Sequence, residues 1–318
     1  MTAKIKAYFD ILKASFNEFL LDNATKLSAS LAYYTVFSIG PLLLVIITLA
    51  GLFFKNNNIT DQVYQQMQRL VGTEGADQLK NILDNISQQN NSTLFGIIGA
   101  VILVFGATTV FVEIQTSINY IWSIRAKPKK GWLEFIRNRL LSFSLILGIG
   151  FLLVVSLLIN TVMDALSGKL QSLLGDANTI LLQIISPVML FFVISLLFAV
   201  IYKVLPDAVI SWRDAFIGAF FTGGLFLLGK FLIGFYLGNS KFSSTYGAAA
   251  SIIIILSWVY YTAMILYFGA EFTKAYSLKL GKGIAPYKTA VFIVKREVKE
   301  LPDSKKDPKH NPANRQHL

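Results

Sequence analysis

Cysteine is absent from this chain of 318 residues, and its two histidines, His310 and His317, both lie near the C-terminal end. Without cysteine the chain can form no disulfide, no thiolate metal site and no cysteine nucleophile. The position of both histidines in a polar tail argues against most histidine-based catalysis and metal binding. We therefore predict no catalytic residues, no metal site and no cofactor, and we do not expect an enzyme.

Charged residues are scarce as well, at 15% of the chain, whereas soluble domains contain about 25%. Hydrophobic residues make up 54%, and the mean hydropathy is +0.57. They form six blocks long enough to cross about 30 Å of hydrocarbon, which takes roughly 20 helical residues. The blocks are Leu27–Phe54, Thr93–Trp122, Leu140–Thr161, Thr179–Leu205, Asp214–Gly238 and Tyr246–Tyr276. This pattern predicts an all-α polytopic membrane protein whose residues 27–276 form a bundle of six transmembrane helices.

The net charge of +11 has two interpretations, a nucleic-acid binder or a membrane protein with basic cytoplasmic loops. Of the 29 Lys and Arg residues, 20 lie in residues 1–26, in the loop 123–139 and in the tail from residue 277. These segments fall on one side of a six-span topology, so the positive-inside rule places both termini in the cytoplasm. We expect a multi-pass membrane protein, with membrane lipids and not nucleic acid as partners.

The N-terminal segment 1–26 has a helical pattern of apolar residues. Ile5, Tyr8, Phe9 and Leu12 recur at the spacing of one helix face, and the pattern continues with Phe16, Phe19 and Leu20. Lysines lie off this stripe, which is typical of an amphipathic helix in the inner membrane interface. A helix packed on the cytoplasmic end of the bundle would give the same pattern, and the sequence leaves both interpretations open.

Two further segments lie outside the spans. The loop 55–92 is too long for a plain connection, and Leu79, Ile82, Leu83 and Ile86 fall at helical spacing within it, so we expect short amphipathic helices that form an extracytoplasmic cap. The tail 277–318 is basic and is expected in the cytoplasm. After about residue 300 it is rich in proline and charge, which predicts disorder.

Three stretches carry a resemblance to a known family. They are "SLAYYTVFSIGPLLLVIITLAG" (Ser30–Gly51), "YKVLPD" followed by "WRDAFIGAF" (Tyr202–Phe220) and "YGAAASIIIILSWVYYTAMILYFGAEF" (Tyr246–Phe272). Together they resemble the YihY / virulence-factor BrkB family of bacterial inner-membrane proteins, over roughly Phe16 to Tyr276. The resemblance implies a membrane location and a helical architecture, and it hints at transport or envelope maintenance.

The same family once carried the label of a tRNA-processing ribonuclease. A hydrolytic nuclease needs a metal cluster, or a general acid and base that reach a large polar substrate. The sequence has no histidine outside the tail, no cysteine and no cluster of acids in any cytoplasmic loop, so a membrane ribonuclease is the least favoured function. We favour a transporter-like or lipid-handling protein. The alternative is a structural or assembly protein of the envelope, whose buried charges only fix helix register. The substrate, a small solute or a lipid, and a homo-oligomeric state stay open.

Lys230 is the most unusual residue of the predicted spans, because it stands in the apolar run "LFLLGKFLIGFY" (Leu225–Tyr236). An uncompensated lysine near the centre of a span costs roughly 2.5–3.5 kcal/mol on insertion scales. The side chain could snorkel to the outer headgroups. Ala219, Gly223 and Gly234 share its helix face, however, and small residues mark the faces where membrane helices touch. This favours a lysine that points into the bundle.

Spans two and six supply the other candidates for a polar intramembrane site. They are Thr109, Glu113, Thr116 and Ser117 in span two and Tyr260, Tyr267 and Glu271 in span six. In span two they form a polar stripe on an otherwise apolar helix, although such hydroxyls often bond only to their own helix. For Glu271 the alternative is an interfacial glutamate next to packing tyrosines. With Lys230, these residues predict a polar cavity lined by spans two, five and six.

Gly40 and Pro41 interrupt the first span. Proline removes a backbone hydrogen bond and kinks or breaks a helix, and freed carbonyls in a membrane need another partner. The pair therefore predicts either a packing kink, which we favour, or a discontinuous helix that lines a site.

Overall fold

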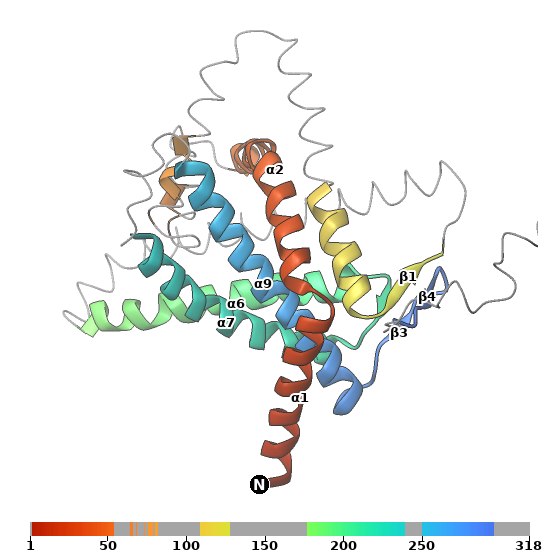
Figure 1. Cartoon of the computed structure of the whole chain (residues 1–318). Helices are drawn as coiled ribbons and strands as arrows, with labels where there is room; N and C mark the ends of the chain where they lie inside the picture. Colours follow the sequence, from red (N-terminus) through yellow and green to blue (C-terminus); the bar gives the residue numbers. More distant parts are fainter. Residues whose placement is uncertain are drawn as a thin grey trace, which may run out of the picture.

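The computed structural model describes residues 2–53, 109–127, 177–238 and 250–295, together with residues 64, 65, 68, 73, 76–78, 80 and 81. Outside the 64–81 segment, it describes the side chains of residues 5–38, 109–127, 187–236 and 252–295. This part of the chain is mostly helical and also contains two small two-stranded sheets (Figure 1). The helices agree with the predicted fold class, whereas the sheets were not expected.

Long helices dominate the fold. They are α1 (Thr2–Leu21), α2 (Ala24–Phe53), α6 (Ala177–Val204), α7 (Trp212–Gly238) and α9 (Ala250–Lys279), and a further helix covers residues 109–121. Within the described part of the chain, three segments are long and apolar enough to cross a membrane, namely Pro187–Val204, Trp212–Tyr236 and Ile252–Lys279. They coincide with the fourth, fifth and sixth predicted spans. The count of six stays a prediction, because span three and the first part of span two lie outside the described residues.

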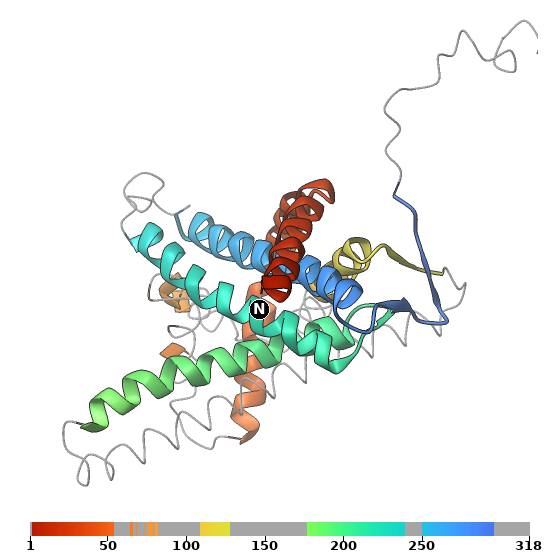
Figure 2. The same ribbon diagram turned by 90° about the horizontal axis from the view of Figure 1, so that it is seen from below.

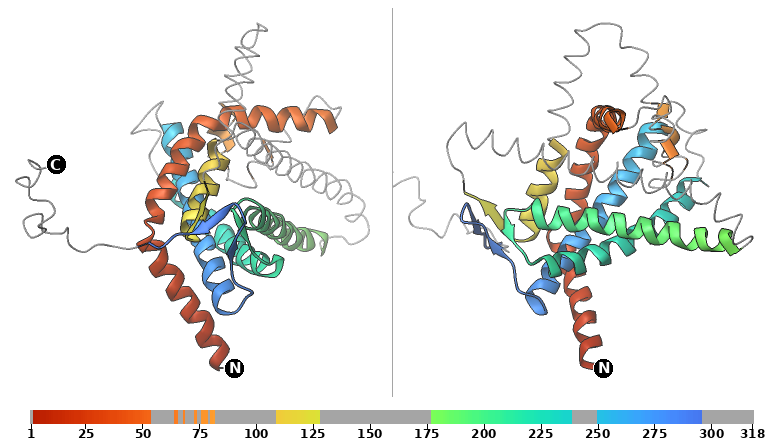
Figure 3. Two further views of the ribbon diagram at one scale, coloured as in Figure 1. Left: turned by 90° about the vertical axis from the view of Figure 1, so that its right-hand side faces the viewer. Right: turned by 180° about the vertical axis from the view of Figure 1, so that it is seen from behind.

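Helix α2 contains the predicted break. Its backbone is assigned as helix without interruption through Gly40 and Pro41, and its ribbon changes direction sharply along its length (Figure 3). A bent but continuous helix is what proline commonly produces. The side chains of residues 39–53 lie outside the described set, so the role of Gly40 and Pro41 in the bend stays a prediction.

Helices α7 and α9 approach closely where one of them carries glycine. A Cβ atom added at Gly218 of α7 would lie 1.9 Å from Thr273 Oγ1 of α9, and one added at Gly229 would lie 1.6 Å from the hydroxyl of Tyr261. Only glycine leaves room for these neighbours. The contact is the small-residue packing by which helices associate in membranes, where burial of apolar surface gives little driving force.

A buried hydrogen-bond network joins α6, α7 and α9. The hydroxyl of Tyr202 donates to the carbonyl of Leu266 (2.8 Å) and lies 3.0 Å from Thr222 Oγ1. Thr222 in turn donates to the carbonyl of Gly218 (2.7 Å). Tyr202 and Thr222 are both fully buried, so these bonds satisfy polar groups that would otherwise be costly among apolar side chains. The network therefore fixes the relative positions of the three helices.

The outward faces of the same helices are apolar. Phe231 and Phe235 of α7 expose 72% and 67% of their surface, and Phe192 of α6 exposes 55%. Large exposed aromatic side chains on an almost wholly apolar helix are expected when the solvent is lipid.

Helix α1 packs along the C-terminal half of α9 (Figures 1 and 2). Ile11 is fully buried there with Tyr276 and Phe272, and Asp10 pairs with Lys279 at 2.9 Å. The hydrogen bond from Lys279 lowers the pKa of Asp10. Since the carboxylate is the bonded form, this contact is present above the unfolded-state pKa and is lost as the pH falls through the lowered value.

The other face of α1 remains exposed. It carries Ile5, Phe9, Leu12, Phe16 and Leu20, each at least 38% exposed. Helix α1 thus packs on the bundle, as one interpretation of its sequence predicts. It also keeps an exposed apolar stripe, as the interpretation of an amphipathic helix predicts. Its location in the membrane interface stays a prediction.

Two short sheets gather at the end of the bundle where α9 ends. Strand β1 (Ile124–Ala126) pairs antiparallel with β4 (Ala290–Phe292), and β2 (Ala208–Val209) pairs with β3 (Ala285–Pro286). The described parts of the loops 123–139 and 206–213 therefore meet the segment that follows α9 (Figure 1). Since α1 packs at this end too, the segments predicted to be cytoplasmic lie together. We call this region the basic end, after the Lys and Arg residues that it carries in the sequence.

The predicted cap is described only in pieces. Residues 64, 65, 68, 73, 76–78, 80 and 81 are helical, and they lie at the opposite end from the N-terminus (Figure 1). The hydroxyl of Tyr64 donates to the Asp77 carboxylate, and Lys80 Nζ lies 5.1 Å from the centroid of the Tyr64 ring. The apolar set Leu79, Ile82, Leu83 and Ile86 and the tail after residue 295 lie outside the described residues.

Candidate functional site

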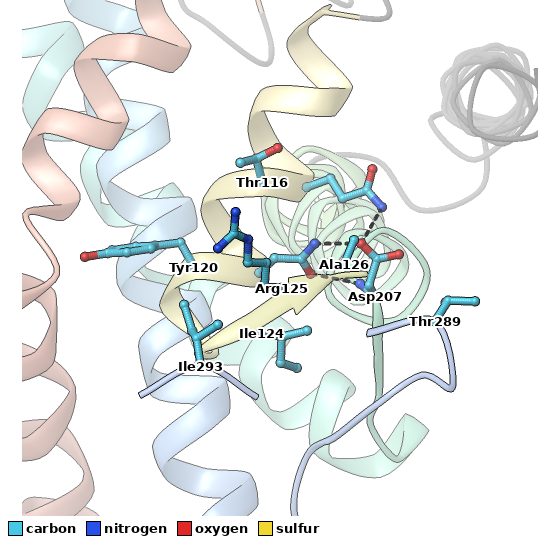
Figure 4. A pocket seen from close by; sticks show the side chains of 10 residues that line it. Thr116, Tyr120, Ile124, Arg125, Ala126, Asp207, Thr289 and Ile293 are labelled. Atoms are coloured by element: carbon cyan, nitrogen blue, oxygen red, sulfur yellow. Dashed lines mark hydrogen bonds between the residues drawn. The ribbon is translucent and has the colours of Figure 1, made fainter. Parts of the chain in front are cut away.

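Asp207 is the centre of a polar cluster at the basic end (Figure 4). It lies in the short connection between α6 and β2. Its Oδ2 accepts a hydrogen bond from Asn119 Nδ2 (2.8 Å) and a longer one from Gln115 Nε2 (3.3 Å). The backbone N–H of Asp207 donates to Asn119 Oδ1 (2.8 Å). Asn119 and Asp207 therefore hold each other in a reciprocal pair that joins the 109–121 helix to α6.

A pocket of about 520 Å³ opens beside this cluster. Its walls come from the 109–121 helix, from β1, from the connection after α6 and from the segment around β4. The lining residues are Gln115, Thr116, Asn119, Tyr120, Ile124, Arg125, Ala126, Asp207, Thr289 and Ile293. Its volume lies within the range of small-molecule sites. Thr116 is the one residue of the predicted polar site that lines it.

The backbone around the pocket is held by contacts between distant segments. Ser123 adopts a left-handed conformation (φ 56°) that turns the chain from helix to β1. The N–H of Ile293 donates to the Ser123 carbonyl, and the N–H of Lys127 donates to the Thr289 carbonyl, both at 2.8 Å. The N–H of Tyr287 donates to the Asp207 carbonyl (3.0 Å). The segment after α9 thus closes one wall of the pocket.

The pocket combines an exposed cation with hydroxyls and an apolar wall. Arg125 is exposed, and its guanidinium lies between Thr116 and Tyr120 in the close view (Figure 4). Ile124 and Ile293 supply apolar surface. A guanidinium binds phosphate or carboxylate through two parallel hydrogen bonds. The arrangement therefore fits a ligand with an anionic group next to an apolar part.

Three carboxylates meet next to the pocket, between α1 and α9. Glu18 lies near the end of α1, Asp22 in the α1–α2 turn and Glu271 in α9, and one oxygen of each lies within 4.8 Å of the others. Asn23 adopts a left-handed conformation (φ 51°), which asparagine tolerates well and which ends α1 at this point. Asp22 and Glu271 are buried, at 4% and 1% exposure. We call these three residues the acid cluster.

Two lysines approach the acid cluster. Lys274 Nζ lies 3.2 Å from Glu18 Oε2 and 3.7 Å from Glu271 Oε2. Lys295, which follows β4, pairs with Asp22 and lies 4.1 Å from the centroid of the Tyr120 ring. Because Tyr120 also lines the pocket, Lys295 connects the pocket to the acid cluster.

Part of the predicted polar site is assembled where the 109–121 helix meets α9. The fully buried Tyr267 lies beside Ser117 and within electrostatic reach of Glu113. One turn further along α9, Glu271 belongs to the acid cluster. Trp122 Nε1 donates to the carbonyl of Ala270 (3.0 Å) and fixes this contact.

The other predicted residues lie elsewhere. Lys230 is half-buried and stands 18 residues after the start of α7, about 27 Å along the helix, so it does not line the pocket. On its predicted face Ala219 is buried, and an added Cβ at Gly223 would lie 2.4 Å from Ser195 Oγ. An added Cβ at Gly234 would meet no atom of the described residues within 4 Å. The face is therefore packed only in part. Thr109 and Tyr260 are partly buried and do not line the pocket.

Several residues of the site were missed from the sequence. No cytoplasmic loop contains a cluster of acids in its sequence, and the acid cluster instead combines residues of two helices and a tight turn. Asn119 and Asp207 are 88 positions apart, a distance at which sequence spacing carries no information. The one available signal was that Asp207 belongs to the stretch "YKVLPD" quoted for the resemblance.

Comparison of the sequence with known proteins is consistent with a chain of apolar membrane helices. The sequence profile described as Virulence factor BrkB matches residues 15–290. This range includes the end of α1, the later helices, the acid cluster and all pocket residues except Ile293. No solved structure matches the chain.

Curated relatives are similar over most of the chain. A UPF0761 membrane protein of Pseudomonas aeruginosa is 29% identical over 260 residues, 80% of this chain and 59% of the relative. The putative ribonuclease-like protein YfkH of Bacillus subtilis is 26% identical over 270 residues, 82% of this chain and 92% of the relative. The chain thus spans about three fifths of the UPF0761 relatives. It is a membrane protein and belongs to the virulence factor BrkB family.

Proposed function

We propose that this protein is a transporter-like or lipid-handling protein of the bacterial inner membrane, and that the pocket at the basic end binds the anionic headgroup of a lipid. The observation that carries this proposal is the pocket of about 520 Å³ with Arg125 among its lining residues. The polar residues of the 109–121 helix lead from it toward Glu113 and Ser117, where Tyr267 is buried. Membrane lipids are then the expected partners.

A lipid is favoured over a small solute by the mixture of groups in the pocket. A small anion would need few apolar neighbours, whereas Ile124, Ala126 and Ile293 form part of the lining. The guanidinium of Arg125 suits a phosphate, and the apolar residues suit the glycerol and first acyl carbons that follow it. Lys230, in the opposite half of α7, is proposed as a second polar position along the same route.

The orientation of the chain is also proposed. The gathering of the N-terminal helix, β1 and the segment after α9 at one end supports a cytoplasmic location for both termini, because their lysines and arginines favour that side. Reporter fusions at Asn57, Lys129, Ser172, Ser240 and Ser304 should report outside, inside, outside, outside and inside. A cytoplasmic signal at Asn57 or Ser172 would contradict the six-span topology.

The alternative functions require different features of the structure. A structural or assembly protein of the envelope needs no ligand in the pocket. A nuclease, the function suggested by the name of the Bacillus subtilis relative, needs acids that reach RNA. The Glu271 side chain is fully buried and the Asp22 side chain is 4% exposed, which disfavours contact with a large polar substrate. We therefore propose that the protein is not an enzyme.

The lipid proposal can be tested with purified protein in liposomes. Labelled phosphatidylglycerol should move between leaflets faster than in protein-free vesicles. Arg125→Gln should slow this movement at least about tenfold, because a hydrogen bond to a charged group contributes about 1.5–3 kcal/mol. Arg213→Gln is the matched control, since Arg213 is an exposed arginine near the same end that does not line the pocket.

Two results would count against the proposal. If wild-type protein moves neither lipids nor small solutes above background, the structural role is favoured. If Arg125→Gln and Arg213→Gln behave alike, the protein moves lipids by a route other than this pocket. The same preparation should leave added RNA intact.

A further inference from the structure

The acid cluster brings three carboxyl groups together with two lysines. Glu18, Asp22 and Glu271 supply three carboxylates, whereas Lys274 and Lys295 supply two ammonium groups. Charges inside proteins are normally paired and hydrogen-bonded because desolvation makes an uncompensated charge unfavourable. Three carboxyl groups with two ammonium groups among them are therefore candidates to bind a further cation.

Glu271 is the most deeply buried residue of the acid cluster. Its side chain is fully buried, and no described residue donates a hydrogen bond to either of its carboxyl oxygens. The nearest ammonium group, Lys274, lies 3.7 Å away and is closer to Glu18. Buried polar atoms are paired in the great majority of cases. Glu271 is therefore an unsatisfied buried ligand that lies together with two further carboxylates.

We propose that Glu18, Asp22 and Glu271 bind a hard divalent cation of the Ca²⁺, Mn²⁺ or Mg²⁺ class. Such ions prefer carboxylate oxygens. Ca²⁺ binds oxygen at about 2.3–2.6 Å, so two ligands on opposite sides of it can lie about 5 Å apart, and the oxygens here lie within 4.8 Å of one another. The side chain of Glu18 is 45% exposed and offers an entry from solvent.

The bound cation and Lys295 are alternative partners for Asp22. Two cations that share one carboxylate repel each other, so binding of the metal displaces the Lys295 ammonium group. With Lys295 displaced, the metal and Lys274 balance the three carboxylates. Lys295 belongs to the segment that contributes Ile293 to the pocket wall. Binding of a cation to the acid cluster therefore influences how firmly Lys295 holds this wall of the pocket in place.

The test is Mn²⁺ binding to the purified full-length chain, measured by the loss of the electron paramagnetic resonance signal of free Mn²⁺. We expect one Mn²⁺ per chain, displaced by Ca²⁺ or Mg²⁺. Glu271→Gln should weaken binding at least tenfold, and Lys295→Met should strengthen it severalfold. Asp10→Asn is the matched control and should bind like wild type, because Asp10 is an exposed acid of α1 that pairs with Lys279 outside the cluster. Size-exclusion profiles establish that each variant is folded.

The opposite effects of Glu271→Gln and Lys295→Met separate a metal site from general damage, which would weaken binding in both variants. Equal binding by wild type and Glu271→Gln would overturn the proposal. It would also be overturned if Mn²⁺ bound only after Lys295 is removed, because the lysine would then be the permanent occupant in the native chain. The readout is binding and not lipid movement, so failure here leaves the proposed function untouched.

Discussion

Replacing Gly269 by valine should remove most of the folded protein from the membrane. A Cβ atom at this position of α9 would lie 2.0 Å from Thr222 Oγ1 and 2.4 Å from the hydroxyl of Tyr202. Both groups belong to the buried network that joins α6, α7 and α9, so they cannot move away without breaking its hydrogen bonds. Overpacking costs about 1–3 kcal/mol, and each buried group left unsatisfied adds about 1–3 kcal/mol.

The measurement is the amount of monodisperse protein extracted from membranes, followed by fluorescence-detected size-exclusion chromatography. Gly224→Val is the matched control, because an added Cβ at Gly224 of α7 meets no atom of the described residues within 4 Å. It should give a wild-type profile. If Gly269→Val also gave a wild-type yield and unfolding midpoint, α7 and α9 would not be packed as described.

Asp214→Ala should lower the midpoint of thermal unfolding by about 5 °C or more. Asp214 lies in the first turn of α7 and is 1% exposed. Its Oδ2 accepts hydrogen bonds from Ser277 Oγ (2.8 Å) and from the N–H of Lys282 (2.9 Å). A carboxylate is also favoured near the start of a helix by the helix dipole. Alanine would leave both donors without this acceptor, at about 1–3 kcal/mol each.

The effect should depend on chemistry as well as on position. Asp214→Asn keeps one acceptor oxygen and should recover part of the lost stability. Asp10→Ala should change the midpoint little, because Asp10 and Lys279 are both more than 40% exposed and such surface pairs contribute about 0–1 kcal/mol. An Asp214→Ala protein as stable as wild type would show that the connection between α7 and the end of α9 does not depend on this carboxylate.

The sequence predicted those secondary-structure elements that form because of residues close together in the chain. An apolar run of about 20 residues can satisfy its backbone in a bilayer only as a helix, so the apolar helices within α6, α7 and α9 followed from composition alone. The strands β1, β2, β3 and β4 have two or three residues each. A segment so short shows no periodicity, and these strands exist only because distant segments meet.

The polar site was predictable only as a set of residue types. Glu271 and Thr116 were recognised because they stand out in apolar surroundings. Their partners did not stand out: Glu18 looks like an ordinary charge on an amphipathic helix, and Asp22 like a turn residue. Which of these acids meet depends on the packing of α1 against α9, which no local pattern specifies. Lys230 attracted attention for the same local reason, yet it lies about 27 Å along α7 from the start of that helix.

The pairing of β1 with β4 sets the order in which parts of the protein can fold during synthesis. Ile124 pairs with Phe292, so a growing chain carries the first strand for more than 160 residues before its partner is synthesised. The helices can insert in the membrane as they leave the ribosome, but the wall that contains Thr289 and Ile293 can form only after β4 has been synthesised. A chain that stops before β4 would therefore insert its helices and still have no ligand pocket.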